Sequence, residues 1–344
     1  MVEINKIDFS ENRNAYMPSK EILKAYKETI EEIYKYPDYK NVDVNNSIAN
    51  FFGISAENVS ITNGSMEGIN LLTRVLNRKK STLFLPTFWG YEDALTRYNY
   101  IVKKNNLIGN LDYDIIQIEK QAKSADLIFL CNPNNPTLSL IEKQNLLSII
   151  KNNPECNFII DETMLLFSTD FDNLTVSKEI TNYSNLSVIL SFSKLFGIAG
   201  LRTGALISNE DIINKMKKEM VPYGIGSIAQ NVIPVALENT EYLNETRKKI
   251  AVNRQNLCES FEQLGDYKII EGVTNFILVK LPDEFNATKL TEYLMKNNMI
   301  VRNINEAYPL LSGEWIRVSI NTETNNKKLI KKIELYQDLS KRQK

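Results

Sequence analysis

The sequence predicts an α/β protein in which a mostly parallel central sheet has helices on both faces, joined to a smaller α+β unit. Between about residues 46 and 207, short β-type runs alternate with helical patterns, which is typical of a parallel sheet. After Gly265 the pattern changes to that of an α+β unit. The chain has 344 residues, 43% of them hydrophobic and 24% charged, which suits one large domain and one smaller domain.

We expect three segments along the chain. The first is an arm with one helix that belongs to the small domain, the second is the large domain, and the third is a connecting helix with the small C-terminal domain. Their limits are residues 1–45, 46–235 and 236–344. Ser19 is a plausible N-cap for the first helix. The connection near Asn239 reads either as a helix break or as a capped restart.

Nine β-type runs predict the strands. Six belong to the large domain, at residues 59–62, 82–85, 126–131, 157–160, 187–190 and 204–207. Three belong to the small domain, at residues 275–280, 299–302 and 315–320. Helices are expected at residues 20–26, 67–76, 141–150, 289–296 and 326–339, and a helix-rich connection at 227–264. Because ligands bind beyond the carboxyl ends of parallel strands, side chains that follow these strands are candidates for a site.

Composition excludes several classes of partner. A formal net charge of -1 gives no general case for nucleic-acid binding. No run approaches the roughly 18 apolar residues of a membrane span, and the first residues lack the apolar core of a signal peptide. The odd, unpatterned set Cys131, Cys156 and Cys258 argues against a disulfide framework. We therefore expect a cytoplasmic protein that binds neither nucleic acid nor membrane.

The chain contains no histidine. This excludes Ser-His-Asp and Cys-His catalysis and histidine-based zinc sites. Proton transfer must therefore be carried out by Lys, Asp, Glu, Tyr or Cys side chains, or by a cofactor.

The segment from Ser191 to Arg202 is the most informative about function. Lys194 follows a predicted strand end, among apolar residues and glycines, eight positions before Arg202. A lysine with few water neighbours can lose its proton near neutrality and attack a carbonyl group. Ser191, Ser193 and Arg202 are groups expected around a phosphate. Together they suggest pyridoxal 5′-phosphate (PLP), a phosphorylated carbonyl compound; a solvated lysine with an ion-paired arginine is the alternative.

Two turns that follow other predicted strands can add to such a site. Gly64 allows a sharp turn, and the amides of Ser65 and Met66 would lie at a helix N-terminus, where anions bind. A simple helix cap is the alternative for this turn. The turn at residues 132–137 is rich in Asn and Pro, and its position at a strand end gives one asparagine side chain access to the cleft.

Charged and aromatic side chains complete the candidate set. Asp161 ends a predicted buried strand, where a carboxylate needs a partner. It could keep the pyridine nitrogen of PLP protonated, or it could cap the next segment. An aromatic residue of segment 86–91 could stack on the ring, although clustered aromatics are commonly core. Arg317, in a predicted strand, suits a substrate carboxylate or a structural salt bridge, and Arg302 has the same ambiguity.

Taken in order, these segments resemble the fold-type I, class I/II PLP-dependent aminotransferases, closest to histidinol-phosphate aminotransferase and threonine-phosphate decarboxylase. The likeness covers nearly the whole chain, from an N-terminal loop at residues 8–18, through residues 36–38, to the strand at 315–320. It implies the aminotransferase fold type I, with PLP in the large domain. It also implies a homodimer whose active sites are shared and whose substrate is a small amino or keto compound.

The resemblance also implies a role for each matching residue. Lys194 resembles the Schiff-base lysine that also moves the proton, and Asp161 resembles the partner of the pyridine nitrogen. The other residues that would bind the cofactor are Asn135 at O3′, Phe88 on the ring face, Ser65, Met66, Ser191, Ser193 and Arg202 around the phosphate, and Tyr36 reaching the phosphate of the neighbouring subunit. The residues that would bind the substrate are Arg317 at the α-carboxylate, and Tyr16 and Arg302 at the distal part.

The chain departs from the family pattern at three places. Leu138 stands where the family commonly has glycine, which concerns the turn alone. Ala15 and Met17 replace the usual Pro and Gly around Tyr16, which makes the role of that tyrosine less secure. Met164 stands where aminotransferases of this group carry a tyrosine that donates to O3′, and decarboxylase relatives also lack that tyrosine.

The sequence leaves three functions to compare. The first is an aminotransferase of amino-acid metabolism that acts on a small, phosphorylated or polar amino acid or amine. The second is a PLP-dependent decarboxylase of a phosphorylated amino acid, similar to threonine-phosphate decarboxylase. The third is a PLP-fold protein without catalysis, and the intact Lys194, Asp161, Asn135 and Arg202 argue against it.

Overall fold

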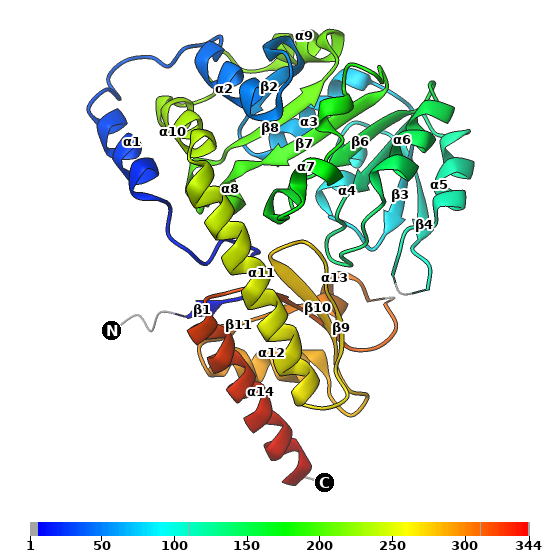
Figure 1. Cartoon of the computed structure of the whole chain (residues 1–344). Helices are drawn as coiled ribbons and strands as arrows, with labels where there is room; N and C mark the ends of the chain where they lie inside the picture. Colours follow the sequence, from blue (N-terminus) through cyan, green and yellow to red (C-terminus); the bar gives the residue numbers. More distant parts are fainter. Residues whose placement is uncertain (1–5, 110, 310, 343–344) are drawn as a thin grey trace.

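The structure is a computed structural model that describes residues 6–109, 111–309 and 311–342. Its larger half is built on a seven-stranded sheet with the order β2-β8-β7-β6-β5-β3-β4 (Figure 1). The strands are β2 (Val59–Thr62), β3 (Lys80–Leu85), β4 (Ile101–Asn106), β5 (Leu127–Cys131), β6 (Asn157–Asp161), β7 (Leu186–Ser191) and β8 (Gly204–Ser208). Strand β8 is antiparallel to both neighbours, whereas the other pairs are parallel. The prediction of a mostly parallel sheet is confirmed.

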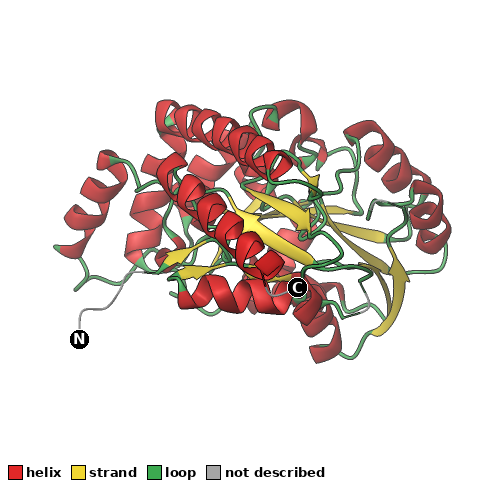
Figure 2. Cartoon of the chain, turned by 90° about the horizontal axis from the view of Figure 1, so that it is seen from below, coloured by secondary structure: helices red, strands yellow, loops and turns green. Residues whose placement is uncertain are grey.

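Helices cover both faces of this sheet, as the view from below shows (Figure 2). The helices are α3 (Ser65–Leu76), α4 (Gly90–Arg97) and α9 (Glu210–Glu219) on one face, and α5 (Ile115–Ala122) and α6 (Lys143–Asn152) on the other. Residues of β5 alternate between the two buried clusters, Phe129 packing on one face and Ile128 and Leu130 on the other. All five residues of β5 are buried, as expected for a strand covered on both sides.

A second, antiparallel sheet forms the smaller half, with the order β12-β13-β10-β9. Its strands are β9 (Lys268–Ile270), β10 (Phe276–Lys280), β12 (Arg302–Asn303) and β13 (Trp315–Ser319). Helices α12 (Ala287–Lys296), α13 (Ile304–Ala307) and α14 (Glu323–Arg342) belong to this half. The single strand predicted at 299–302 is wrong, because β11 (Met299–Ile300) pairs with β1 (Ile7–Asp8) while β12 joins the larger sheet of this half.

Two consecutive helices connect the halves. Helix α10 (Ser227–Glu238) lies against the large half, and α11 (Thr240–Gln263) runs down to the small half (Figure 1). The side chain of Asn239 accepts a hydrogen bond from the Tyr242 amide, so the connection is a capped restart. The two helices therefore follow one another with only Asn239 between them.

The N-terminal segment belongs to both halves. Helix α1 (Lys20–Ile30) packs against α10, and α2 (Val42–Phe52) packs against α10 and β2. The Ser19 side chain accepts from the Ile22 amide, which confirms the predicted N-cap. Before α1, the chain crosses the small sheet, where the Ser319 amide donates to the Phe9 carbonyl. The segment of residues 8–16, called here the strap, therefore runs between the two halves.

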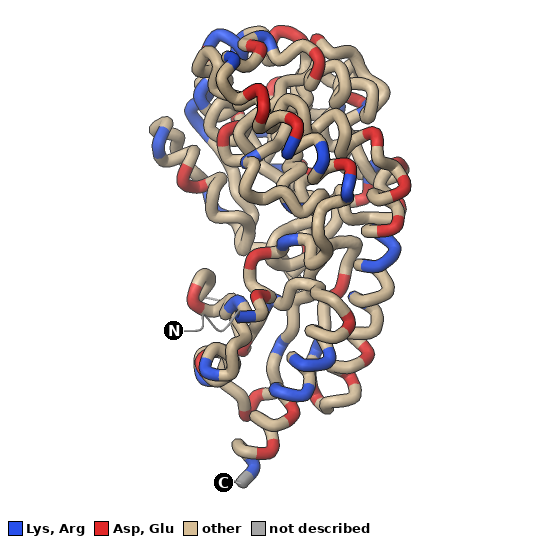
Figure 3. The backbone as a smooth tube through the Cα atoms, turned by 90° about the vertical axis from the view of Figure 1, so that its left-hand side faces the viewer, with Lys and Arg blue, Asp and Glu red and all other residues tan. Residues whose placement is uncertain are grey.

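The remaining elements are short and include the helices α7 (Phe171–Leu174) and α8 (Phe192–Leu195). In the described part of the chain, no helix has the length and apolar character needed to cross a membrane. Figure 3 shows Lys and Arg mixed with Asp and Glu over both halves of the molecule. The domain limits given above stay a prediction.

Candidate active site

Lys194 lies at the carboxyl end of the central sheet. Strand β7 ends at Ser191, and the short helix α8 that follows carries Lys194. Its Nζ donates to the carbonyl oxygen of Glu11 in the strap, at 3.1 Å. Burial lowers the pKa of Lys194 to about 8, and the nearby guanidinium of Arg317 adds to the shift. An appreciable fraction of this amine is therefore neutral and nucleophilic in the range where an ordinary lysine stays charged.

Asp161 ends the adjacent strand β6 and is 4% exposed. Its Oδ2 accepts from the Tyr91 hydroxyl at 2.7 Å, and its Oδ1 accepts from the Thr163 amide at 2.9 Å. Burial raises the pKa of Asp161, while these donors and the ammonium of Lys194 oppose the rise. Both carboxylate oxygens are thus held in place, and each keeps a lone pair for a further donor.

Two glycines, Arg202 and the first amides of α3 pack closely together, and this group of residues is called here the cradle. Gly64 has a φ of +78°, and a Cβ built on it would come within 2.8 Å of Nη2 of Arg202. A Cβ on Gly204 would come within 2.9 Å of the Ser65 amide nitrogen. Only glycines allow the guanidinium and the helix amides to come this close, and their combination suits a phosphate.

The two predicted phosphate serines differ in their surroundings. The hydroxyl of Ser193 donates to the carbonyl of Thr203 and accepts from the Thr203 amide, each at 3.1 Å. Its proton is therefore used within the chain. The buried Ser191 hydroxyl has no hydrogen bond to any residue that the structure describes, so it keeps its donor for a ligand. Of the two, Ser191 is the better candidate.

Arg317 in β13 faces the same site from the small half. Its Nη1 donates to Oδ1 of Asn135 at 2.7 Å, and its Nη2 donates to the Ser10 carbonyl of the strap. Its Nε is buried without a partner, and no carboxylate pairs with it within the described residues. Burial lowers the pKa of Arg317 to about 10, so it is still a cation at neutral pH. The structure thus offers no support for the alternative of a structural salt bridge.

Arg302 and Tyr16, the two candidates for the distal part of the substrate, lie in different environments. Arg302 is exposed and is the register partner of Arg317 across the β12–β13 pair. The charge of Arg302 adds to the lowering of the pKa of Arg317, so an anion bound beside the two guanidinium groups would be stabilised by both. Tyr16 instead accepts a hydrogen bond from Asn253 of α11 at 2.6 Å, which turns its hydroxyl toward that helix.

Phe88 is half-buried beside the cradle, and Tyr36 lies outside it. The ring of Phe88 and the side chain of Met66 occupy the space that a Cβ on Gly90 would need. Tyr36 is 87% exposed, and its ring lies 5.2 Å from that of Tyr223 on the molecular surface. The structure therefore brings Phe88 to the site, but it does not bring Tyr36 there within a single chain.

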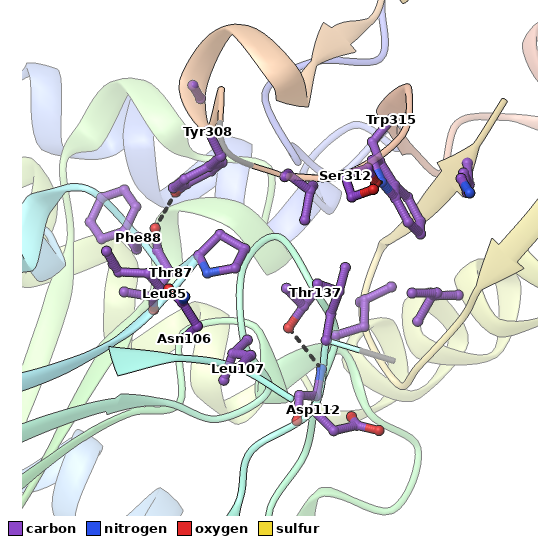
Figure 4. Close-up of a pocket in the computed structure, with 18 of the residues that line it drawn as sticks. Leu85, Thr87, Phe88, Asn106, Leu107, Asp112, Thr137, Tyr308, Ser312 and Trp315 are labelled. Carbon is purple, nitrogen blue, oxygen red and sulfur yellow. Dashed lines mark hydrogen bonds between the residues drawn. The ribbon is translucent and has the colours of Figure 1, made fainter. Parts of the chain in front are cut away.

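A cavity adjoins the site, and Lys194 is not among the residues that line it. It has a volume of about 1140 Å³ and lies between the halves, with Thr87 and Phe88 on one side and Tyr308 and Trp315 on the other (Figure 4). The hydroxyl of Tyr308 donates to the Thr87 carbonyl and closes one end. The cavity opens beside the face where Phe88 is packed.

Sequence reasoning missed three participants. Tyr91 was one of several clustered aromatics, and nothing in its local pattern indicates a bond to Asp161, which is 70 residues away. The Glu11 carbonyl and the hydroxyl of Tyr308 are also brought in by tertiary contacts. The usable signal for Tyr91 was its position at the start of a helix that follows a strand end, the same signal that selected Phe88.

The family model of aminotransferase class I and II matches residues 4–333. Histidinol-phosphate aminotransferase from Pyrococcus furiosus is 30% identical to this chain over 90% of the chain and 85% of the relative. The structure of histidinol-phosphate aminotransferase from Clostridium acetobutylicum is similar with a TM-score of 0.91 and 26% identity, covering 96% of this chain and 99% of that one. L-threonine-O-3-phosphate decarboxylase from Porphyromonas gingivalis has the same fold, with a TM-score of 0.85, 22% identity and coverage of 96% and 99%. The chain therefore belongs to the aminotransferase class I and II family.

Proposed function

We propose that this protein is a PLP-dependent aminotransferase that acts on a small amino acid or amine with a phosphate or another polar group. The observation that carries the proposal is the setting of Lys194. Its pKa is lowered to about 8 by burial, and its charged neighbours include Arg317, Arg202 and Asp161. A lysine with a lowered pKa, placed between an anion-binding cradle and a buried carboxylate, is the arrangement that a phosphorylated carbonyl cofactor requires.

The residues fit PLP in detail. The cradle, with Gly64, Gly204 and Arg202, would hold the phosphate of PLP, and Asp161 would hold its ring nitrogen. Phe88 would cover the ring face, and Asn135 would donate to O3′ through its amide NH₂, since its Oδ1 already accepts from Arg317. When bound, PLP supplies an electron sink that weakens the bonds at Cα of the amino substrate.

The protein's own residues then bind the substrate and move the proton. Arg317 binds the α-carboxylate, because it is a buried cation whose Nε has no partner among the described residues and whose other two donors contact neutral oxygens. The neutral Nζ of Lys194 takes the proton from Cα of the substrate. It then delivers that proton to C4′ of the cofactor, on the other side of the transferred nitrogen. The strap carbonyl of Glu11 holds Nζ before substrate enters.

A phosphorylated substrate is favoured by the second arginine. Arg302 lies beside Arg317 on the neighbouring strand and is exposed, so it is free to bind an anion distal to Cα. The printed names of the relatives, histidinol-phosphate aminotransferase and threonine-phosphate decarboxylase, agree with such a substrate.

Decarboxylation of a phosphorylated amino acid is the second candidate. The observation that favours it is Met164, which is 3% exposed, three residues after Asp161. Methionine cannot donate a hydrogen bond to the cofactor as a tyrosine would. We favour transamination because the matching family model is that of aminotransferases and the relative at 30% identity is named an aminotransferase.

We also propose a cytoplasmic homodimer with shared sites. The tyrosine patch, which consists of Tyr36, Tyr39 and Tyr223, lies on the surface with ring centroids 5.2 and 5.7 Å apart. A second copy that covers this patch would bring Tyr36 to the phosphate cradle of its neighbour. A reducing compartment is supported by the three cysteines, all of them buried and unpaired.

The test is incubation of the purified protein with O-phosphoserine, O-phosphothreonine, glutamate and histidinol phosphate. Cofactor absorption and CO₂ release are followed together. Conversion of the cofactor to its pyridoxamine form without CO₂ supports transamination, whereas CO₂ release with an unchanged cofactor supports the second candidate. A protein that binds PLP and does neither contradicts both. Lys194→Ala is the control that should abolish either outcome.

A further inference from the structure

Tyr91 is a fully buried tyrosine that the proposed mechanism does not use. It lies in the first turn of α4 and is 0% exposed. Its ring stacks on Phe129 of β5, with centroids 4.9 Å apart and planes 13° apart. The ring of Phe88 packs against it in a T-shaped arrangement, with centroids 5.5 Å apart and planes 78° apart. The aromatic ring is thus fixed from two sides.

The hydroxyl of Tyr91 has one acceptor, the carboxylate of Asp161. The bond from Oη to Oδ2 is 2.7 Å long. The opposite oxygen, Oδ1, accepts from the Thr163 amide, so the carboxylate cannot rotate without breaking a hydrogen bond at one end. Because both partners are buried, loss of the hydroxyl would leave Oδ2 without this donor inside the protein.

We propose that Tyr91 is the positioning residue of the cofactor site. Its hydroxyl orients the Asp161 carboxylate, and its ring orients the Phe88 ring by direct packing. The inference rests on the proposed function, in which Asp161 holds the ring nitrogen and Phe88 covers the ring face. One side chain then determines both the polar and the aromatic contact to the ring. No charge on Tyr91 is needed, because its contribution is a fixed donor.

The hydrogen bond from Tyr91 favours protonation of the ring nitrogen of the cofactor. A donor on Oδ2 keeps Asp161 in its ionised form, and an ionised Asp161 keeps the ring nitrogen protonated. Removal of the donor raises the proton affinity of Asp161, so the shared proton moves toward the carboxylate and the ring becomes a weaker electron sink. The ionisable groups that also interact electrostatically with Asp161 are Lys194 on α8, Cys131 at the end of β5, Tyr113 and the adjacent Glu162, whose side chain is turned away from the site.

The experiment compares Tyr91→Phe with Tyr113→Phe in the PLP-loaded enzyme. Tyr113 is a matched control, since it is also buried and donates to the Cys131 carbonyl at 3.0 Å without a bond to Asp161. Both variants lose one buried hydroxyl, so both should lose similar thermal stability. Only Tyr91→Phe should raise the pH midpoint of the cofactor's visible absorption, and it should lower kcat about tenfold with little change in KM.

A double variant separates positioning from general damage. In an Asp161→Asn background, Tyr91→Phe should leave the pH midpoint where Asp161→Asn alone puts it, because the two groups act as a unit. Equal shifts in Tyr91→Phe and Tyr113→Phe, or a wild-type midpoint in Tyr91→Phe, would overturn the inference. Failure of the wild-type protein to bind PLP at all would instead contradict the proposed function.

Discussion

Asp161 and Glu162 are adjacent buried carboxyl groups with different surroundings. Asp161 is turned toward Lys194 and Tyr91, whereas Glu162 is turned away and accepts from the Thr175 hydroxyl and the Val176 amide. Burial raises the pKa of Glu162 to about 7. Strand alternation therefore gives one carboxylate to the site and the other to the core.

The raised pKa of Glu162 predicts a pH-dependent stability. The folded protein holds this proton more tightly than the unfolded chain, whose glutamate has the ordinary pKa of 4.5. The contribution is therefore fully present below pH 4.5 and is lost as the pH rises toward 7, by about 3 kcal/mol at most. Urea unfolding at pH 5 and pH 7.5 should show a smaller decrease for Glu162→Gln than for wild type. An equal decrease in both proteins would contradict the assignment.

Met164 predicts a spectral property of the loaded enzyme. A tyrosine at this position could donate to O3′, and a second donor stabilises negative charge there. The nitrogen of the Lys194 linkage then loses its proton more easily. Met164→Tyr should therefore lower the pH midpoint of the cofactor's visible absorption. Met164→Phe, which adds the ring without the hydroxyl, should leave the midpoint where it is; a shift of the same size in both variants would argue against the donor.

At the scale of elements, the phosphate cradle depends on how β2 passes into α3. Gly64, with its φ of +78°, is the N-cap of α3, and Arg202, with a φ of +52°, ends the turn after α8. Two turns with left-handed residues thus meet at one point. The sequence predicted the turn at Gly64, but it could not show that Arg202 faces it.

Gly64→Ala tests whether the close approach of Arg202 to this turn matters, and Gly53→Ala is the control. The added Cβ would meet the Arg202 guanidinium at 2.8 Å, whereas a Cβ on Gly53, with a φ of +67°, would meet nothing within 4 Å. Gly53→Ala should cost about 1–2 kcal/mol of unfolding free energy, because its backbone is left-handed. Gly64→Ala should cost more, because a φ of 78° with a ψ of 171° is a conformation that essentially only glycine adopts. Only Gly64→Ala should weaken PLP binding, by tenfold or more, in a fluorescence titration of the cofactor-free protein. Equal PLP affinity in the two variants would show that the cradle does not hold the phosphate.

Sequence reasoning succeeded for elements with a strong local signal. The fully buried runs of β5, β6 and β7 and the Ser19 cap are read directly from residue type. Strand β4 was missed because its sequence, Ile-Val-Lys-Lys-Asn-Asn, is polar and mostly exposed at the sheet edge. An edge strand buries too little surface to need an apolar pattern.

The residues of the candidate site were predictable where they have a local signal, but the contacts between them were not. Lys194, Asp161, Arg202 and Arg317 each follow or lie in a strand that the pattern identifies, and the resemblance relates them to one another. The bond from Tyr91 to Asp161 and the bond from Lys194 to the strap depend on tertiary packing, and no local pattern encodes them. The hydroxyl of Ser193 looked equivalent to that of Ser191 until its two bonds to Thr203 were known.

At the scale of the whole molecule, the tyrosine patch predicts how two copies assemble. Tyr36 is 87% exposed although it is a large aromatic residue, and a second copy would cover it. Sedimentation at increasing concentration should show a dimer for wild type and for Tyr36→Phe alike. Tyr36→Phe should nevertheless bind PLP less tightly, because it keeps the ring and loses the hydroxyl. The control is Tyr34→Phe, which changes an equally exposed neighbour and should bind PLP as wild type does.

The strap has a consequence for the order in which the protein acquires its site during synthesis. The guanidinium of Arg317 bonds to the carbonyl of Ser10, a partner 307 positions earlier in the chain. Ser319 likewise bonds to Asn12, so part of the strap has its partners in β13. A ribosome-bound chain can complete the central sheet while its Lys194 is still uncovered on the strap side. We expect the strap to close fully over the reactive amine only after β13 has been made, because these partners are 307 residues away.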